Sequence, residues 1–153
     1  MTQVTPRREE TILLRTRELI DDSLRNHLCF LALRTENGKA FHLGRLVRTM
    51  FASYYLLEAG YGVGETEIFT DADEIFTSIA VRTPLDAPFT LHADAVLPTA
   101  KLLELYDKQL QISPVLSLVQ AHQKAKMNLG AAPHEQLSIA ALIQRAKARA
   151  RIQ

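Results

Sequence analysis

Hydrophobic side chains recur at helical spacing over residues 43–61. They stand three or four positions apart, at Leu43, Leu46, Val47, Met50, Tyr54, Leu57 and Tyr61. This spacing places them on one face of an α-helix. Gly60 suits the left-handed conformation that commonly ends a helix. The pattern predicts a helix whose apolar face packs into a core and whose end is marked by glycine.

The preceding segment has the same periodicity and a signal for a helix start. Thr5 is a suitable N-cap and Pro6 suits the first helical position. Apolar residues follow at helical spacing, at Ile12, Leu13, Leu19, Ile20, Leu24, Leu28 and Leu31. We expect one long helix from about Pro6 to Arg34, which forms an antiparallel αα-hairpin with the next helix. Asn37-Gly38 is also a strong turn signal, so a β-hairpin over residues 28–43 stays open as the alternative.

Three further helices and a basic terminal helix complete the predicted fold. Their expected ranges are 65–83, 94–110, 114–129 and 134–153. A pair of strands within residues 77–97 is the alternative for the middle of the chain. The sequence therefore predicts an all-α protein: a single compact bundle of five or six helices over residues 1–153. The last helix, 134–153, is expected at its periphery.

Composition fits a globular protein of 153 residues, of which 47% are hydrophobic. The longest apolar run, residues 28–33, is far shorter than the ~20 residues that a membrane-spanning helix needs. The N-terminus lacks the apolar region of a signal peptide. Cys29 is the only cysteine, so no internal disulfide can form. We expect a cytoplasmic protein with no membrane partner.

Charge is segregated along the chain behind an overall net charge of +1. Residues 1–50 carry nine Lys/Arg against six Asp/Glu, and residues 101–153 carry eight against three. Residues 51–100 carry one Lys/Arg against eight Asp/Glu. Three roles are open for this layout. The acidic middle can pair with the basic ends inside the fold, it can pair with a second copy, or the basic ends can bind a polyanion such as nucleic acid while the acidic face points away.

Basic residues supply the candidate nucleic-acid contacts, because Lys and Arg bound to phosphates provide most non-specific affinity. The candidates are Arg7, Arg8, Arg15, Arg45, Arg48, Arg145, Lys147, Arg149 and Arg151. The alternative is that the basic C-terminal helix only complements its own dipole and keeps the chain soluble.

A second group of residues forms the candidate partner interface. Aromatic residues beyond the main apolar stripe of residues 43–61 widen its apolar arc, as at subunit interfaces, and an acidic cluster follows at residues 71–74. The group is Phe41, Phe51, Tyr55, Asp71, Asp73 and Glu74. We expect a homodimer or a subunit of a larger assembly.

Motifs for catalysis, metals and cofactors are missing from the sequence. The histidines have no zinc-site spacing, and Cys29 lies two positions from His27, which points the two to different faces of a helix. The glycines of residues 60–64 follow a predicted helix instead of a strand, and acidic residues come after them, which argues against a phosphate loop. We expect no metal site, no cofactor and no enzymatic activity.

The segments "GRLVRTMFASYYLLEAGYG" and "LLELYDKQL" resemble a group of small helical proteins from bacterial plasmids and integrative elements. The resemblance rests on apolar patterns and a glycine cap, so no functional residue can be carried over. It implies a bacterial, cytoplasmic accessory or regulatory protein. With the charge pattern, it favours a nucleic-acid-associated regulatory protein, with a protein-binding adaptor as the alternative and an enzyme third.

Overall fold

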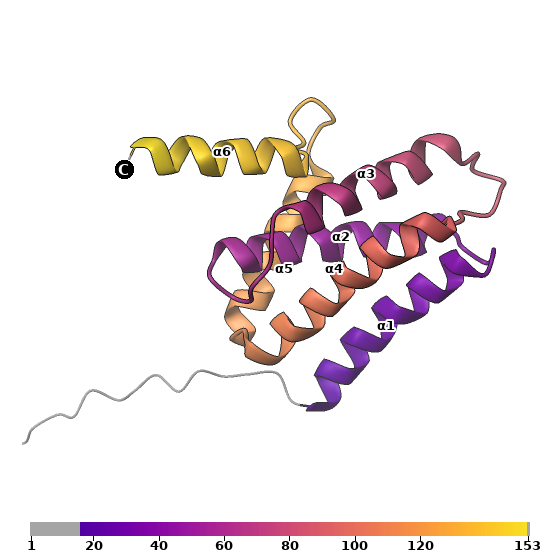
Figure 1. The fold of residues 1–153 in the computed structure, drawn as a ribbon, viewed down its shortest axis with the longest axis horizontal. Coiled ribbons are helices and arrows are strands. Elements are labelled where there is room, and N and C mark those ends of the chain that lie inside the picture. The colour runs from indigo at the N-terminus through magenta and orange to yellow at the C-terminus, as the bar shows by residue number, and fades with distance from the viewer. Residues whose placement is uncertain (1–15, 153) are drawn as a thin grey trace, which may run out of the picture.

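The computed structural model of the chain describes residues 16–152, which form six helices (Figure 1). The helices are α1 (Thr16–Arg34), α2 (Ala40–Glu58), α3 (Glu67–Arg82), α4 (Ala93–Ile112), α5 (Val115–Gly130) and α6 (Ile139–Ile152). The described residues contain no strand beyond one isolated bridge. The prediction of an all-α fold that begins with an αα-hairpin is confirmed, since α1 packs on α2.

Helix α2 is the central helix of the bundle and packs against α1, α3, α4 and α5. Its side chains Leu46 and Met50 are fully buried, and Leu43 and Tyr54 are nearly so. The apolar stripe predicted over residues 43–61 is therefore core, as expected. Burial of this stripe helps to hold the helices together, because each buried aliphatic or aromatic side chain is worth roughly 1.5–3 kcal/mol.

Helix α1 confirms the predicted helix over its described part, while residues 6–15 of the prediction lie outside the described residues. Most of the apolar stripe that indicated this helix does not face the core. Its members Ile20, Leu24, Leu28 and Leu31 are about half exposed, whereas Leu19 is partly buried and packs against the core. The buried face instead carries Cys29, Phe30, Leu33 and the polar Asn26. A polar group can be buried there because side chains of α2 bond to it.

The connection between α1 and α2 is pinned by the segment before α4. The Phe89 N–H donates to the Gly38 carbonyl at 3.0 Å, and the Leu91 N–H donates to the Leu33 carbonyl at 2.8 Å. Both alternatives with strands, over residues 28–43 and 77–97, are wrong, because these residues form helix ends joined by single backbone bonds. The bond from Leu91 satisfies the Leu33 carbonyl in the last turn of α1, where the helix itself supplies no donor.

Helix α2 ends at Glu58, and the predicted glycine, Gly60, caps it two residues later. Gly60 has φ +95°, its N–H donates to Leu57 at 3.0 Å, and the Tyr61 N–H donates to Leu56 at 2.9 Å. These two bonds make a Schellman cap, which requires the left-handed conformation at Gly60. The cap turns the chain toward α3.

Helix α6 begins at Ile139, later than the predicted start at residue 134. The reason is a loop closed by Asn128, whose side chain accepts from the Leu137 N–H at 2.7 Å and donates to the Leu137 carbonyl at 2.8 Å. Ser138 then caps the helix by accepting from the Ala141 N–H. From there α6 packs on α3 and runs out from the bundle (Figure 1).

The close approach at Gly38 gives a prediction about stability. A Cβ atom at this position would lie 2.1 Å from the Phe89 carbonyl oxygen and 2.7 Å from Leu33. We expect Gly38→Ala to lower the free energy of unfolding by roughly 1–3 kcal/mol, measured by urea denaturation.

Gly44→Ala is the matched control. Gly44 lies in α2, and a Cβ atom added there would meet no other atom within 4 Å. This substitution should stabilise the protein by roughly 0.5–1 kcal/mol, because alanine favours helices. Equal effects of the two substitutions would contradict the crowding at Gly38.

Candidate functional site

A carboxylate on α1, Asp22, joins three helices. Its Oδ1 accepts from the Arg45 guanidinium on α2 at 2.8 Å, and its Oδ2 accepts from the Tyr106 hydroxyl on α4 at 2.9 Å. The sequence gives no local sign of this junction, because Asp22 and Tyr106 are 84 positions apart. The Arg45 guanidinium compensates the negative charge of Asp22. The junction therefore places charge-assisted hydrogen bonds between helices that also pack through apolar side chains.

Arg45 is a predicted candidate for nucleic-acid binding, and the structure places it inside the fold. Besides Asp22, its Nε donates to the Asn26 Oδ1 at 2.9 Å, and that same oxygen accepts from Thr49 at 3.1 Å. The guanidinium therefore links α1 to α2. Its bonds are directed at the protein and not outward to a phosphate.

Tyr106 extends the junction to α5, where its oxygen lies 2.6 Å from the His122 Nε2. Because the Tyr106 proton points to Asp22, the His122 Nε2 must carry a hydrogen and donate it. The imidazole then keeps an unprotonated Nδ1. Burial is the main cause that lowers the pKa of His122, which favours this neutral form, while burial and the neighbouring Asp22 raise the pKa of Tyr106.

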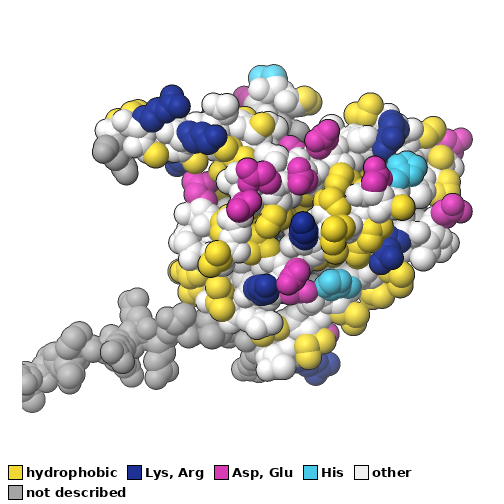
Figure 2. Space-filling model, in the orientation of Figure 1, with side chains coloured by type: hydrophobic (Ala, Val, Ile, Leu, Met, Phe, Trp, Pro, Cys, Tyr) yellow, Lys and Arg dark blue, Asp and Glu magenta, His cyan; other side chains and the backbone are white. Residues whose placement is uncertain are grey.

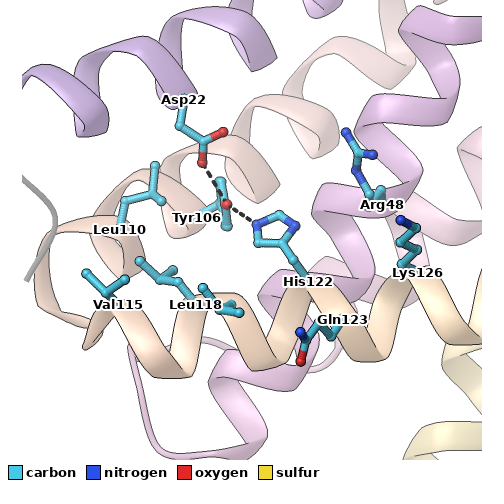
Figure 3. Close-up of a pocket in the computed structure, with 10 residues that line it drawn as sticks. Asp22, Arg48, Tyr106, Leu110, Val115, Leu118, His122, Gln123 and Lys126 are labelled. Carbon is cyan, nitrogen blue, oxygen red and sulfur yellow. Dashed lines mark hydrogen bonds between the residues drawn. The ribbon is translucent and has the colours of Figure 1, made fainter.

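A pocket of about 410 Å³ lies beside this junction (Figure 3). The polar side chains at its wall and mouth are Asp22, Arg48, Tyr106, His122, Gln123 and Lys126. Its aliphatic side chains are Leu110, Val115, Leu118 and Val119. Arg48 from α2 and Lys126 from α5 lie on the same side of the His122 ring in the close-up. Arg48 is a predicted candidate, whereas sequence reasoning missed Lys126 because no motif marks it.

The basic residues of α6 are all exposed and gather at its outer end. Figure 2 shows them as a dark blue group at the upper left of the molecule. Arg149 pairs with Glu58 of α2 at 3.1 Å. Within residues 16–152, Arg145, Lys147 and Arg151 have no ion pair. Of the remaining candidates, Arg7, Arg8 and Arg15 lie outside the described residues.

The candidate interface residues do not form one surface. Phe51 is buried in the core at 5% exposure, which corrects its placement at an interface. Phe41 is 66% exposed near the start of α2, whereas Tyr55 is half-buried under the Lys124 ammonium almost four turns later. The widened apolar arc reflects a helix that is buried on several sides, since α2 is central.

The acidic candidates Asp71 and Glu74 are exposed on α3. Asp73 is half-buried and accepts from the Ile139 N–H, the first residue of α6, and from Thr77. Burial is the main cause that raises its pKa, and both hydrogen bonds oppose the rise. Asp73 therefore anchors the N-terminus of α6 on α3, where a carboxylate is favourable to the helix dipole.

Residues 16–152 offer little other chemistry. They contain no group of three or more His, Cys, Asp or Glu side chains placed to hold a metal ion. None of the helices in this range has the length and apolar character needed to cross a bilayer. Cys29 is buried, and burial raises the pKa of its thiol. Comparisons with protein-family models, with curated proteins and with solved structures found no match.

The half-buried His122 predicts a pH dependence of stability. Its pKa in the folded protein lies below the ordinary 6.5, so the unfolded chain binds a proton that the folded chain resists. Stability is therefore lost as the pH falls below about 6.5. We expect His122→Gln to lose less stability than the unaltered protein between pH 7.5 and pH 5.5 in urea denaturation.

His134→Gln is the matched control, since His134 is 80% exposed on the α5–α6 connection. This variant should keep the pH dependence of the unaltered protein. An unchanged pH dependence in His122→Gln would show that His122 is not the group responsible.

Proposed function

We propose that this protein binds nucleic acid through α6 and acts as a non-enzymatic accessory or regulatory protein. The observation that carries the proposal is the arrangement of α6, which leaves the bundle and carries four cations along its outer half, of which Arg149 also pairs with Glu58. Helix α6 contains no acidic residue. Among the described residues, two acidic side chains contact α6: Asp73 accepts from the Ile139 N–H at its start, and Glu58 pairs with Arg149 at 3.1 Å near its end.

The spacing of the cations suits a groove between two phosphate backbones. Arg145 and Arg149 are one turn apart on one face, and Lys147 and Arg151 are one turn apart on another. The two faces differ by about 200° around the helix axis, because each residue adds about 100°. A helix with its side chains is about 10–12 Å across, and the DNA major groove is about 12 Å wide. Cations on two opposite sides would then meet phosphates on both sides of the groove.

Small side chains between the cations keep the helix slim. Ala146, Ala148 and Ala150 alternate with the basic residues and carry no hydrogen-bonding group for base edges. This composition supports contacts to phosphates over direct reading of sequence. The proposed binding is therefore non-specific and sensitive to salt.

The test is a fluorescence-anisotropy titration of random-sequence double-stranded and single-stranded DNA from low to moderate salt. Four phosphate contacts to duplex DNA predict a slope of log K against log salt of roughly −3 to −4. We expect the variant with Gln at Arg145, Lys147, Arg149 and Arg151 to bind weakly and to lose most of this slope.

Lys101→Gln with Lys108→Gln is the control, because both lysines are exposed on α4 away from α6. This pair should leave the affinity nearly unchanged. Equal affinity and equal slope in the α6 variant and the unaltered protein would reject α6 as the binding element. Failure of the unaltered protein to bind at low salt would reject the proposed function.

We also propose self-association through the exposed stripe of α1, whose residues are Ile20, Leu24, Leu28 and Leu31. The stripe has spacings of four, four and three residues, which is symmetric to within one residue. In an antiparallel pair of α1 helices, Ile20 would lie near Leu31 of the second copy and Leu24 near Leu28. A two-fold axis requires such self-complementarity, so a second copy of this chain fits the stripe.

Analytical ultracentrifugation tests this assembly. We expect a dimer at tens of micromolar and a monomer for Leu24→Glu, because a charge in the centre of the stripe would be desolvated. Leu85→Glu is the matched control on the α3–α4 connection, where Leu85 is 94% exposed; this variant should remain dimeric. A monomeric unaltered protein would contradict self-association.

A further inference from the structure

We propose that the pocket beside Asp22, Tyr106 and His122 binds a small organic anion with an aliphatic tail, such as a medium-chain carboxylate. The pocket has a volume of about 410 Å³, which falls in the range of sites for small molecules. The proposal is independent of nucleic-acid binding by α6, because none of the pocket residues lies on α6.

The apolar part of the pocket suits an aliphatic chain. Leu110 of α4 and Val115, Leu118 and Val119 of α5 supply only aliphatic carbon. Tyr106 and His122 are the only aromatic side chains of the described residues that line the pocket, and a hydrogen bond joins the Tyr106 Oη to the His122 Nε2. The lining therefore offers little surface for stacking a nucleobase and favours a ligand with a saturated tail.

Two cationic side chains lie where the anionic head group of the ligand would bind. Arg48 of α2 and Lys126 of α5 line the pocket, and neither has an ion pair with a described residue. The one carboxylate in the wall, Asp22, is already compensated by Arg45 at 2.8 Å and bonded to Tyr106. The uncompensated charge at the pocket is therefore positive, which favours an anion.

The distance between the aliphatic part and the cationic part of the pocket sets the length of the ligand. Val115 and Lys126 lie on the same helix, α5, eleven positions apart. At 1.5 Å per residue this separation is roughly 16 Å. An extended medium-chain carboxylate can place its head between Arg48 and Lys126 and its tail beside Leu118 and Val115.

Junction residues fix the wall against which this ligand would lie. The bonds from Tyr106 to Asp22 and to His122 hold α1, α4 and α5 around the pocket (Figure 3). Because these side chains are already held in place in the free protein, ligand binding costs less conformational entropy.

The experiment is isothermal titration calorimetry of the delipidated full-length protein with decanoate, compared with decanol. We expect decanoate to bind and decanol to bind at least several-fold more weakly. Arg48→Gln and Lys126→Gln should each weaken decanoate binding roughly 3–5-fold, as partly exposed ion pairs do, and the double variant more. Lys101→Gln is the matched control and should bind as the unaltered protein does.

A further variant tests whether the aliphatic tail of decanoate occupies the apolar part of the pocket, and it leaves the charge of the protein unchanged. Val119→Phe narrows the pocket at a side chain that is 46% exposed, so the fold should tolerate it. We expect it to weaken decanoate binding roughly 5-fold or more. Circular dichroism checks that each variant is folded.

Three outcomes would overturn the proposal. They are no decanoate binding to the unaltered protein, equal binding of decanol and decanoate, and decanoate binding that none of the pocket variants changes. The quadruple α6 variant should bind decanoate normally, which separates failure of this proposal from failure of nucleic-acid binding.

Discussion

The position of Asp22 inside the bundle is the constraint on which the rest of the structure depends. A partly buried carboxylate is costly unless a cation and hydrogen bonds compensate it. Arg45 and Tyr106 provide that compensation from α2 and α4, and His122 of α5 completes the set through Tyr106. Four helices are therefore held in one relative arrangement by a single polar junction.

The junction also decides what is left at the surface. Asp22, Asn26 and Arg45 occupy part of the space between α1 and α2, while Ile20, Leu24, Leu28 and Leu31 lie on the outer side of α1. On the other side, the bond between Tyr106 and His122 forms one wall of the pocket, and the aliphatic residues of α5 form another. The exposed α1 stripe and the pocket thus have a common origin.

Much of the fold could be predicted from local signals, since periodicity and caps act within a few residues. The helix over residues 43–61, its end at Gly60 and the start of α5 after Pro114 are examples. The buried face of α1 could not be predicted, because Asn26 is stabilised by Arg45 and Thr49, which lie far along the sequence. For the same reason the sequence offered Arg45 as a surface cation and contained no sign of the pocket. The exposed cations of α6 could be named from sequence because their helix contacts little else.

The most direct test of this account is a double-mutant cycle on Asp22→Ala and Tyr106→Phe, measured as free energies of unfolding in urea. If the junction holds α1 to α4, the two substitutions are coupled. A hydrogen bond to a charged group predicts a coupling of about 1.5 kcal/mol or more. Effects that add within about 0.5 kcal/mol would contradict the account, because they would mean that the two side chains stabilise the fold independently.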